Sequence, residues 1–240
     1  MPWKAGQASM PAAWRLDAAV GVVTTALLAR AYGGRAAVRY LAGFGGACGA
    51  LQAALDVLHR RAGSGRLGWA DLVTYARADC GAVLAGLLAS GIRDRTGPAG
   101  RLGWAVSLVG ATALDWFDGP LARRAGPTDL GAALDIEADS WLTVWCAAAA
   151  TAWGGLPRWC LLPPLLRYLD PLFALRAGRL PAGGGPWWAR LTGTAQMALF
   201  LTALAPLPVH RRFPASIAGV VSAAQTATLL WLLVRRRHGR

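Results

Sequence analysis

The chain has 240 residues, of which 55% are hydrophobic and 15% are charged. An average soluble domain carries about 25% charged residues, so this composition excludes a disordered chain, a collagen-like chain and an ordinary cytosolic enzyme, and it indicates an integral membrane protein. The 25 basic and 12 acidic residues give a net charge of +13. Because the arginines lie between apolar segments, bilayer topology and anionic headgroups explain this charge better than a nucleic-acid partner does.

Residues 1–66 are expected to form an N-terminal extension. Its two apolar stretches, Leu16–Tyr32 and Tyr40–Leu58, are short and are interrupted by charged residues such as Arg30 and Asp56. The pattern alone leaves two arrangements open. The stretches span the membrane as an extra pair of helices, or they lie on its interface.

Residues 67–240 are expected to form an all-α, polytopic membrane domain. Apolar segments fill this part of the chain, and the loops between them are rich in Gly, Pro or Arg. Several segments reach the roughly 20 residues that a spanning helix needs. The six segments are Leu72–Ser90, Leu102–Phe117, Leu130–Ala152, Trp159–Leu175, Trp187–Leu207 and Ala215–Val234.

The distribution of arginine predicts the topology of these segments. If the loop after the second segment is cytoplasmic, the cytoplasmic side carries about twice as many arginines as the other side. The positive-inside rule therefore favours a cytoplasmic second loop and a cytoplasmic C-terminus.

The cysteines stand alone in apolar stretches, without the spacing of a metal-binding motif. This pattern favours small core residues over a disulfide framework or a structural metal site. The four are Cys48, Cys80, Cys146 and Cys160.

Acidic residues are scarce, yet half of the 12 lie between residues 115 and 139, at the ends of two apolar segments. Asp115 and Asp118 are three residues apart, and Asp135 and Asp139 are four apart, so each pair shares one face of a helix. The short connection between the segments predicts an antiparallel hairpin whose pairs face each other. An ionisable residue at membrane depth costs at least about 2.5–3.5 kcal/mol, which makes these aspartates candidates for a functional site.

The chemistry of this cluster points to a metal-bound phosphate. An all-carboxylate set suits Mg²⁺, Mn²⁺ or Ca²⁺ and not zinc, and two metals sharing such ligands can clamp phosphate oxygens. Gly119, Ala122 and Gly131 are small enough to let a bulky ligand approach the backbone, and Arg123 places a planar cation beside the carboxylates. The two other acids of the cluster, Asp129 and Glu137, are interpreted as helix-cap or solvated loop charges.

The stretch from Asp115 to Asp139 reads D-x2-D-G-x2-A-R-x7-G-x3-D-x3-D. It resembles the defining motif of the CDP-alcohol phosphatidyltransferase family, and all eight defining positions stand at the family spacing. Two shorter stretches also resemble the family. DLVTYARA is similar to its N-L-x-T-x-x-R entry, which points to Thr74 and Arg77, and ARLTGTAQ is similar to a stretch of several bacterial members in which Arg190 stands for a lysine.

The resemblance implies a bundle of six transmembrane helices around a polar cavity, in an integral protein of the bacterial cell membrane whose active site faces the cytoplasm. It implies a transferase of phospholipid biosynthesis, which passes a phosphatidyl-type group from CDP-diacylglycerol to an alcohol and releases CMP. The implied partners are this CDP-lipid, the alcohol or alcohol phosphate and membrane lipids, with no nucleic acid. The resemblance also allows a homodimer.

The resemblance further implies a role for each residue of the motif. Carboxylates would hold two Mg²⁺ or Mn²⁺ ions, and one of these carboxylates would act as the general base. Small residues, a threonine and arginines would bind the CDP-lipid. One further arginine would bind the phosphate of an acceptor. The metal ligands are Asp115, Asp118, Asp135 and Asp139, the base is Asp139, the CDP-lipid residues are Gly119, Ala122, Arg123, Gly131, Thr74 and Arg77, and the acceptor residue is Arg190.

Several alternatives stay open at this point. Glycerol 3-phosphate and inositol phosphate both need a cationic pocket for their phosphate, which Arg190 would supply. Serine, free inositol and a second lipid also remain open as acceptors. Arg167 and Asp170, three residues apart in an apolar segment, either pair within their helix or line the acceptor pocket. The alternative functions are a membrane cation transporter and a non-catalytic family member that acts as an assembly partner.

Overall fold

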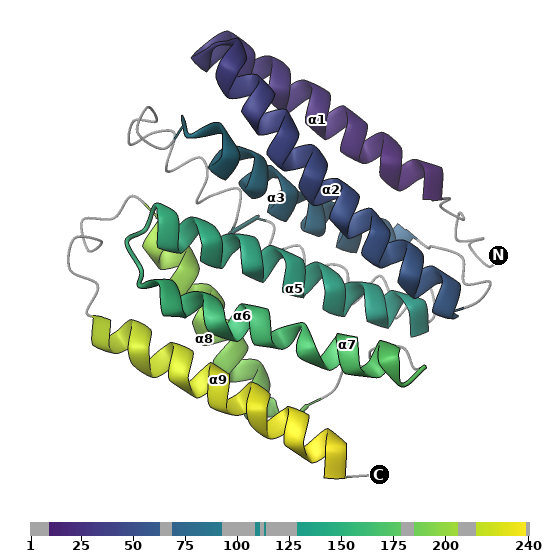
Figure 1. Cartoon of the computed structure of the whole chain (residues 1–240), viewed down its shortest axis with the longest axis vertical. Coiled ribbons are helices and arrows are strands. Elements are labelled where there is room, and N and C mark those ends of the chain that lie inside the picture. The colour runs from purple at the N-terminus through teal and green to yellow at the C-terminus, as the bar shows by residue number, and fades with distance from the viewer. Residues whose placement is uncertain are drawn as a thin grey trace, which may run out of the picture.

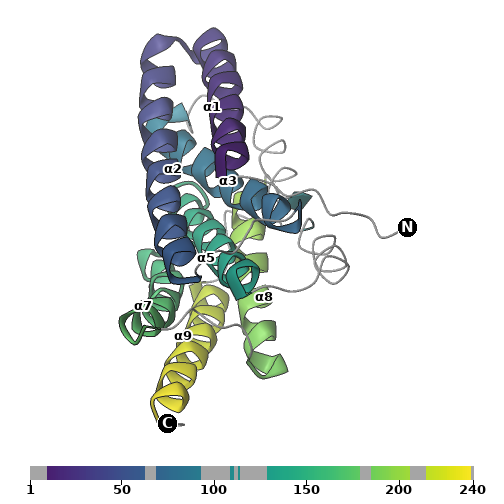
Figure 2. The same cartoon turned by 90° about the vertical axis from the view of Figure 1, so that its right-hand side faces the viewer.

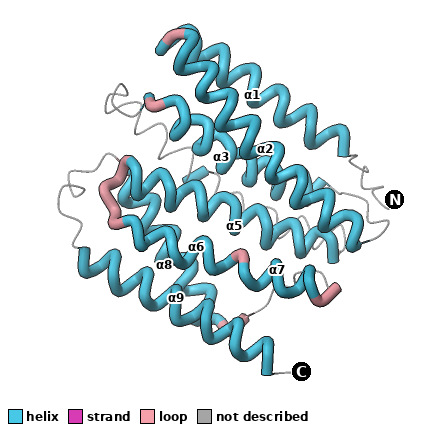
Figure 3. The backbone as a smooth tube through the Cα atoms, viewed as in Figure 1, coloured by secondary structure: helices cyan, strands magenta, loops and turns pink. Residues whose placement is uncertain are grey.

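The structure is a computed structural model that describes residues 10–62, 69–92, 109–110, 113, 129–178, 185–205 and 215–238. In these ranges the regular elements are helices and no strand occurs (Figure 3), which confirms the all-α class. The elements are α1 (Met10–Tyr32), α2 (Gly34–Ala62), α3 (Trp69–Ser90), α5 (Asp129–Ala152), the 3-10 turn η2 (Arg158–Leu161), α6 (Leu162–Arg167), α7 (Leu169–Arg176), α8 (Trp187–Leu204) and α9 (Ala215–His238).

The helices form a bundle in which α3 and α5 occupy the middle. The pair α1 and α2 lies at one end of the bundle, and α8 and α9 lie at the other (Figures 1 and 2). Helix α3 packs on α2 and on α5, and α6 packs on both α5 and α9. This order places α3 between the N-terminal extension and the helix that carries two of the motif aspartates.

Three of the described helices are long and apolar enough to cross a membrane. They cover Gly34–Arg61, Asp71–Ser90 and Ala215–Arg235. The span Gly34–Arg61 belongs to α2, in the N-terminal extension. For α2, a membrane-spanning arrangement therefore fits better than an interfacial one. The count of six spanning helices stays a prediction, since the segment expected at Leu102–Phe117 lies outside the described residues apart from 109–110 and 113.

A single glycine reverses the chain between α1 and α2. Gly33 has a φ of 89°, and its N–H donates to the carbonyl oxygen of Ala29 at 3.0 Å, which caps the end of α1. A side chain at this φ is strained, so glycine is the residue that allows the reversal. The two helices therefore run as an antiparallel hairpin (Figure 2).

The segment expected at Trp159–Leu175 is divided into η2, α6 and α7. Pro171 explains the break between α6 and α7, because a proline has no N–H to donate and its ring clashes with the carbonyl four residues earlier, which is that of Arg167. The N–H of Tyr168 donates to Leu165 at 3.2 Å, three residues back. Arg167 thus lies at the end of a short helix and not in the middle of a long one.

Helices α2 and α3 cross at close range because glycines lie at the crossing. A Cβ built on Gly43 would lie 2.8 Å from the carbonyl oxygen of Ala85, and one built on Gly86 would lie 2.6 Å from the ring of Tyr40. Tyr40 is fully buried there. At this crossing the backbone of each helix therefore lies close to its neighbour, with the ring of Tyr40 packed on Gly86.

This crossing predicts a contrast between two alanine substitutions in α2. Gly43→Ala should lower the free energy of unfolding by about 1–3 kcal/mol relative to Gly45→Ala, because it overpacks the α2–α3 crossing. At Gly45 nothing lies within 4 Å of the added Cβ, and alanine gains helix propensity at both positions. Denaturation of the purified protein in detergent measures the difference, and equal stabilities would contradict the packing.

Candidate functional site

One stripe of α5 carries the second half of the motif. Gly131, Asp135 and Asp139 follow one another at intervals of four residues, so they lie one above the other on one helix face. The helix is rich in alanine, and Asp129 stands in its first turn, where a negative charge is favoured by the helix dipole. The side chains of Asp135 and Asp139 are 49% and 39% exposed, so both carboxylates can be reached by a ligand.

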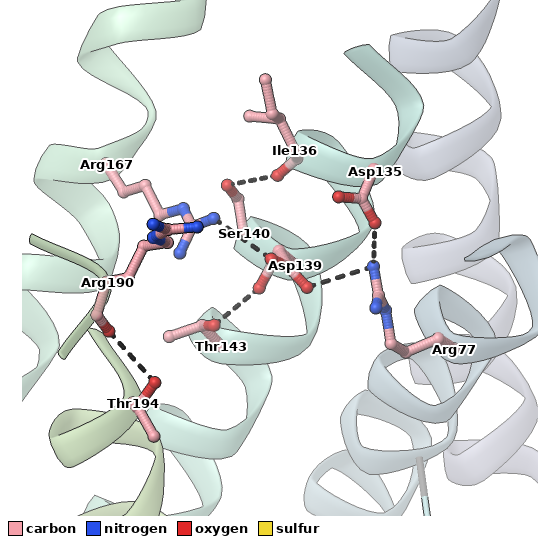
Figure 4. Close-up of polar contacts among 9 residues, drawn as sticks. All are labelled: Arg77, Asp135, Ile136, Asp139, Ser140, Thr143, Arg167, Arg190 and Thr194. Carbon is pink, nitrogen blue, oxygen red and sulfur yellow. Dashed lines mark hydrogen bonds and ion pairs between the residues drawn. The ribbon is translucent and has the colours of Figure 1, made fainter. Parts of the chain in front are cut away.

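Arg77 connects these two carboxylates to α3. Its Nη2 donates to Oδ1 of Asp135 at 2.5 Å and lies 3.1 Å from Oδ1 of Asp139 (Figure 4). The arginine side chain is only 1% exposed, whereas a guanidinium is rarely buried unless it is paired. Gly81, one turn further along α3, lies against Trp141 of α5, and this close approach of the helices brings the guanidinium to both acids.

Arg167 reaches the same acid from the other side. Its Nη2 lies 3.5 Å from Oδ2 of Asp139, so the two oxygens of this carboxylate face two different arginines (Figure 4). The sequence suggested that Arg167 pairs with Asp170 or lines an acceptor pocket. Its observed partner on α5 comes from 28 residues earlier in the chain.

Arg190 adds a third cation near this position. It lies in the first turn of α8 and is exposed, and its carbonyl oxygen accepts a hydrogen bond from Oγ1 of Thr194 at 3.0 Å. Its side chain extends toward Arg167 and Asp139 (Figure 4). The two arginines give one side of the site a positive charge, which suits an anionic group.

The structure places the other predicted residues as follows. Thr74 is buried on α3, about one turn before Arg77, and Gly131 is half-buried on α5. The remaining predicted residues lie outside the described residues: Asp115, Asp118, Gly119, Ala122 and Arg123. The hairpin that would bring the two pairs of aspartates together therefore stays a prediction.

The interpretation of Glu137 as a helix-cap or solvated loop charge is wrong. Glu137 lies inside α5 and is 9% exposed. It is two residues from both Asp135 and Asp139, so the helix turns its side chain away from the face that those two acids share. Asp129, in contrast, is the first residue of α5, as a helix-cap charge should be.

The described half of the motif fits a hard divalent cation. Its donors are carboxylate oxygens on one helix face, one turn apart and partly exposed, and oxygen donors are those that Mg²⁺ and Mn²⁺ prefer. Asp135 and Asp139 could therefore hold such an ion together with ligands from the preceding segment.

Comparison with known proteins gives one family. Residues 67–234, more than half of the chain, match the family described as CDP-alcohol phosphatidyltransferase. This range contains the described aspartates, both arginines that touch them and Arg190. Comparisons with curated proteins and with solved structures gave no match.

The burial of Arg77 predicts how the site responds to loss of its acids. The double variant Asp135→Ala/Asp139→Ala leaves a buried guanidinium without these partners and should lose about 3 kcal/mol of folding free energy. Adding Arg77→Met should recover most of this loss, because the uncompensated charge is removed. Thermal unfolding in detergent measures both variants, with the exposed Asp129→Ala as a control, and a triple variant no more stable than the double would contradict the pairing.

Proposed function

We propose that this chain, which belongs to the CDP-alcohol phosphatidyltransferase family, transfers a phosphatidyl-type group from CDP-diacylglycerol to an alcohol and releases CMP, as a step of phospholipid biosynthesis. The observation that carries the proposal is the pair Asp135 and Asp139, which is partly exposed on α5 and held by a buried arginine. Residues 67–240 would form the catalytic membrane domain, with residues 1–66 as an extension.

The motif carboxylates would bind divalent metal ions, which the family generally requires. The proposed ligands are Asp115, Asp118, Asp135 and Asp139, and two Mg²⁺ or Mn²⁺ ions would neutralise the diphosphate of the CDP-lipid and stabilise the departing CMP. Gly119, Ala122 and Gly131 would line the cytidine site and Arg123 would contact phosphate. The contacts of Arg77 support a positioning role for it, because its guanidinium is engaged with both acids.

The transfer itself is a displacement at phosphorus. The alcohol oxygen attacks the β-phosphorus, the bond from this phosphorus to the oxygen shared with the CMP phosphate breaks, and the alcohol proton passes to the carboxylate of Asp139. A positioned base of this kind contributes about 10²–10⁴-fold. Asp139 suits the role because its Oδ2 faces Arg167, on the side toward which Arg190 also extends.

The positive side of the site supports a phosphorylated acceptor. Arg167 and Arg190 lie on the side of Asp139 away from Arg77 (Figure 4), where an incoming alcohol would arrive. Two guanidinium groups match the geometry and charge of a phosphate. Glycerol 3-phosphate and inositol phosphate are therefore the acceptors we propose. The site would face the cytoplasm, as the arginine distribution predicts, and the membrane would be that of a bacterial cell, as the family resemblance implies.

The decisive experiment follows the lipid product. Purified protein is incubated with labelled CDP-diacylglycerol, Mg²⁺ and each candidate alcohol, and we expect CMP together with one new phospholipid, both lost in EDTA. Asp139→Asn keeps the shape but removes the basicity, so the rate should fall by about 10²-fold or more, while Asp129→Asn should retain it. A cation transporter or a non-catalytic assembly partner would release no CMP with any alcohol, and full release in EDTA would contradict the metal requirement.

The acceptor has its own prediction. Arg190→Ala should raise the KM for the phosphorylated alcohol and leave the KM for CDP-diacylglycerol nearly unchanged, because only binding of the acceptor loses a contact. Arg158→Ala removes an exposed arginine of η2, outside the proposed site, and serves as the matched control. An acceptor KM that is the same in wild type and Arg190→Ala would show that this arginine does not bind the acceptor.

A further inference from the structure

A second polar cluster lies where α1, α2 and α3 meet, inside the N-terminal half of the bundle. It consists of Asp17 from α1, Cys48 from α2 and Asp79 from α3, and one ligand atom of each lies within 4.8 Å of the others. Cys48 and Asp79 are buried and Asp17 is half-buried. Two of the three residues precede residue 67, so the cluster is distinct from the family motif.

Asp79 lacks the partners that a buried carboxylate needs. Its residue is 3% exposed, and neither of its oxygens has a hydrogen-bond partner in the described part of the chain. It also lies near the middle of the candidate membrane span Asp71–Ser90, where an ionisable side chain is costly and marks a functional site by default. A cation between its oxygens and the neighbouring ligand atoms would supply the missing partner.

Asp17, in contrast, is already oriented by side chains of the other two helices. Gln52 on α2 donates from Nε2 to Oδ2 of Asp17 at 2.9 Å, and the hydroxyl of Tyr75 on α3 donates to the same oxygen at 2.8 Å. Gln52 also donates to the Tyr75 hydroxyl. Outer hydrogen bonds of this kind are what fixes the ligands of metal sites in proteins.

The helix geometry brings ligand and support together. Tyr75 and Asp79 are four residues apart on α3, so they share the face that packs toward α1 and α2. Arg77 lies between them in sequence and is turned to the opposite face, toward α5. One helix therefore presents the candidate catalytic site on one side and the three-helix cluster on the other.

We propose that Asp17, Cys48 and Asp79 bind one Zn²⁺ ion that fastens the N-terminal helix pair to α3. A cysteine thiolate with two carboxylates is a donor set for zinc, whereas Mg²⁺ and Mn²⁺ prefer oxygen ligands alone. The three anionic ligands exceed the charge of the ion by one, and the donors Gln52 and Tyr75 on Asp17 offset this excess. Zinc would bind with loss of the thiol proton.

Cobalt substitution tests this site separately from the motif aspartates. Metal-depleted full-length protein in detergent is titrated with Co²⁺, and we expect the near-ultraviolet charge-transfer absorption of a thiolate–cobalt bond, saturating at one equivalent and abolished by Zn²⁺. The motif aspartates contain no sulfur and cannot produce this signal. The result does not depend on whether the protein transfers a phosphatidyl group.

Variants assign the signal to its ligands. Cys48→Ser should abolish the absorption, and Cys146→Ser, which changes a buried cysteine of α5, should keep it. Tyr75→Phe should weaken cobalt binding by about 10–100-fold, because the hydrogen bond to Asp17 is lost. If Cys48→Ser does not fold, loss of the signal in Asp79→Asn takes its place.

Two results would overturn the proposal. The first is a wild-type protein that shows no thiolate–cobalt absorption, which would mean that the two carboxylates share a proton in place of a metal ion. The second is an absorption that persists in Cys48→Ser, which would place the bound cobalt at another cysteine, or one that persists unchanged in Asp79→Asn, which would show that Asp79 is not a ligand.

Discussion

The buried guanidinium of Arg77 is the constraint on which the described site depends. A positive charge that is 1% exposed between two apolar helices is tolerated only when it is paired, and its partners are two carboxylates one turn apart on α5. The pairing fixes how α3 and α5 are rotated about their axes. Asp135 and Asp139 are thereby held on one face, where they stay accessible to a ligand. The small residue Gly81, which lies against Trp141, allows the helices to come close enough for this contact.

Helix α3 organises the bundle because its two sides meet different chemistry. Arg77 faces the helix with the motif aspartates, and Tyr75 and Asp79 face the extension, where Tyr75 is hydrogen-bonded to Asp17. The extension is thus connected to the family domain through the helix that also orders the candidate catalytic acids.

Local pattern accounts for much of this structure. Apolar length predicted α3, α5, α8 and α9, and the spacing of Asp135 and Asp139 predicted their shared face, since both features depend only on helix periodicity.

Contacts between residues far apart in the chain could not be predicted from local pattern. Arg167 pairs with an acid 28 residues earlier, and its position follows from the break at Pro171, which the length of the apolar segment concealed. Cys48 is buried in the core, as its apolar sequence context predicts, but its proximity to Asp17 and Asp79 follows from the packing of three helices and has no local spacing to reveal it. The acids of the first motif half lie outside the described residues, and their placement stays a prediction.

The central claim is that Arg77 holds Asp135 and Asp139 in the geometry that the transfer requires. It is tested most directly by the rate of CMP release at saturating Mn²⁺, measured for wild type and Arg77→Gln. Saturating metal removes differences in metal affinity between the two proteins. Because the carboxylates of Asp135 and Asp139 would be misplaced in Arg77→Gln, its kcat should be about 10²-fold lower than that of wild type. A kcat equal to that of wild type, measured for an Arg77→Gln protein that is folded, would contradict the account.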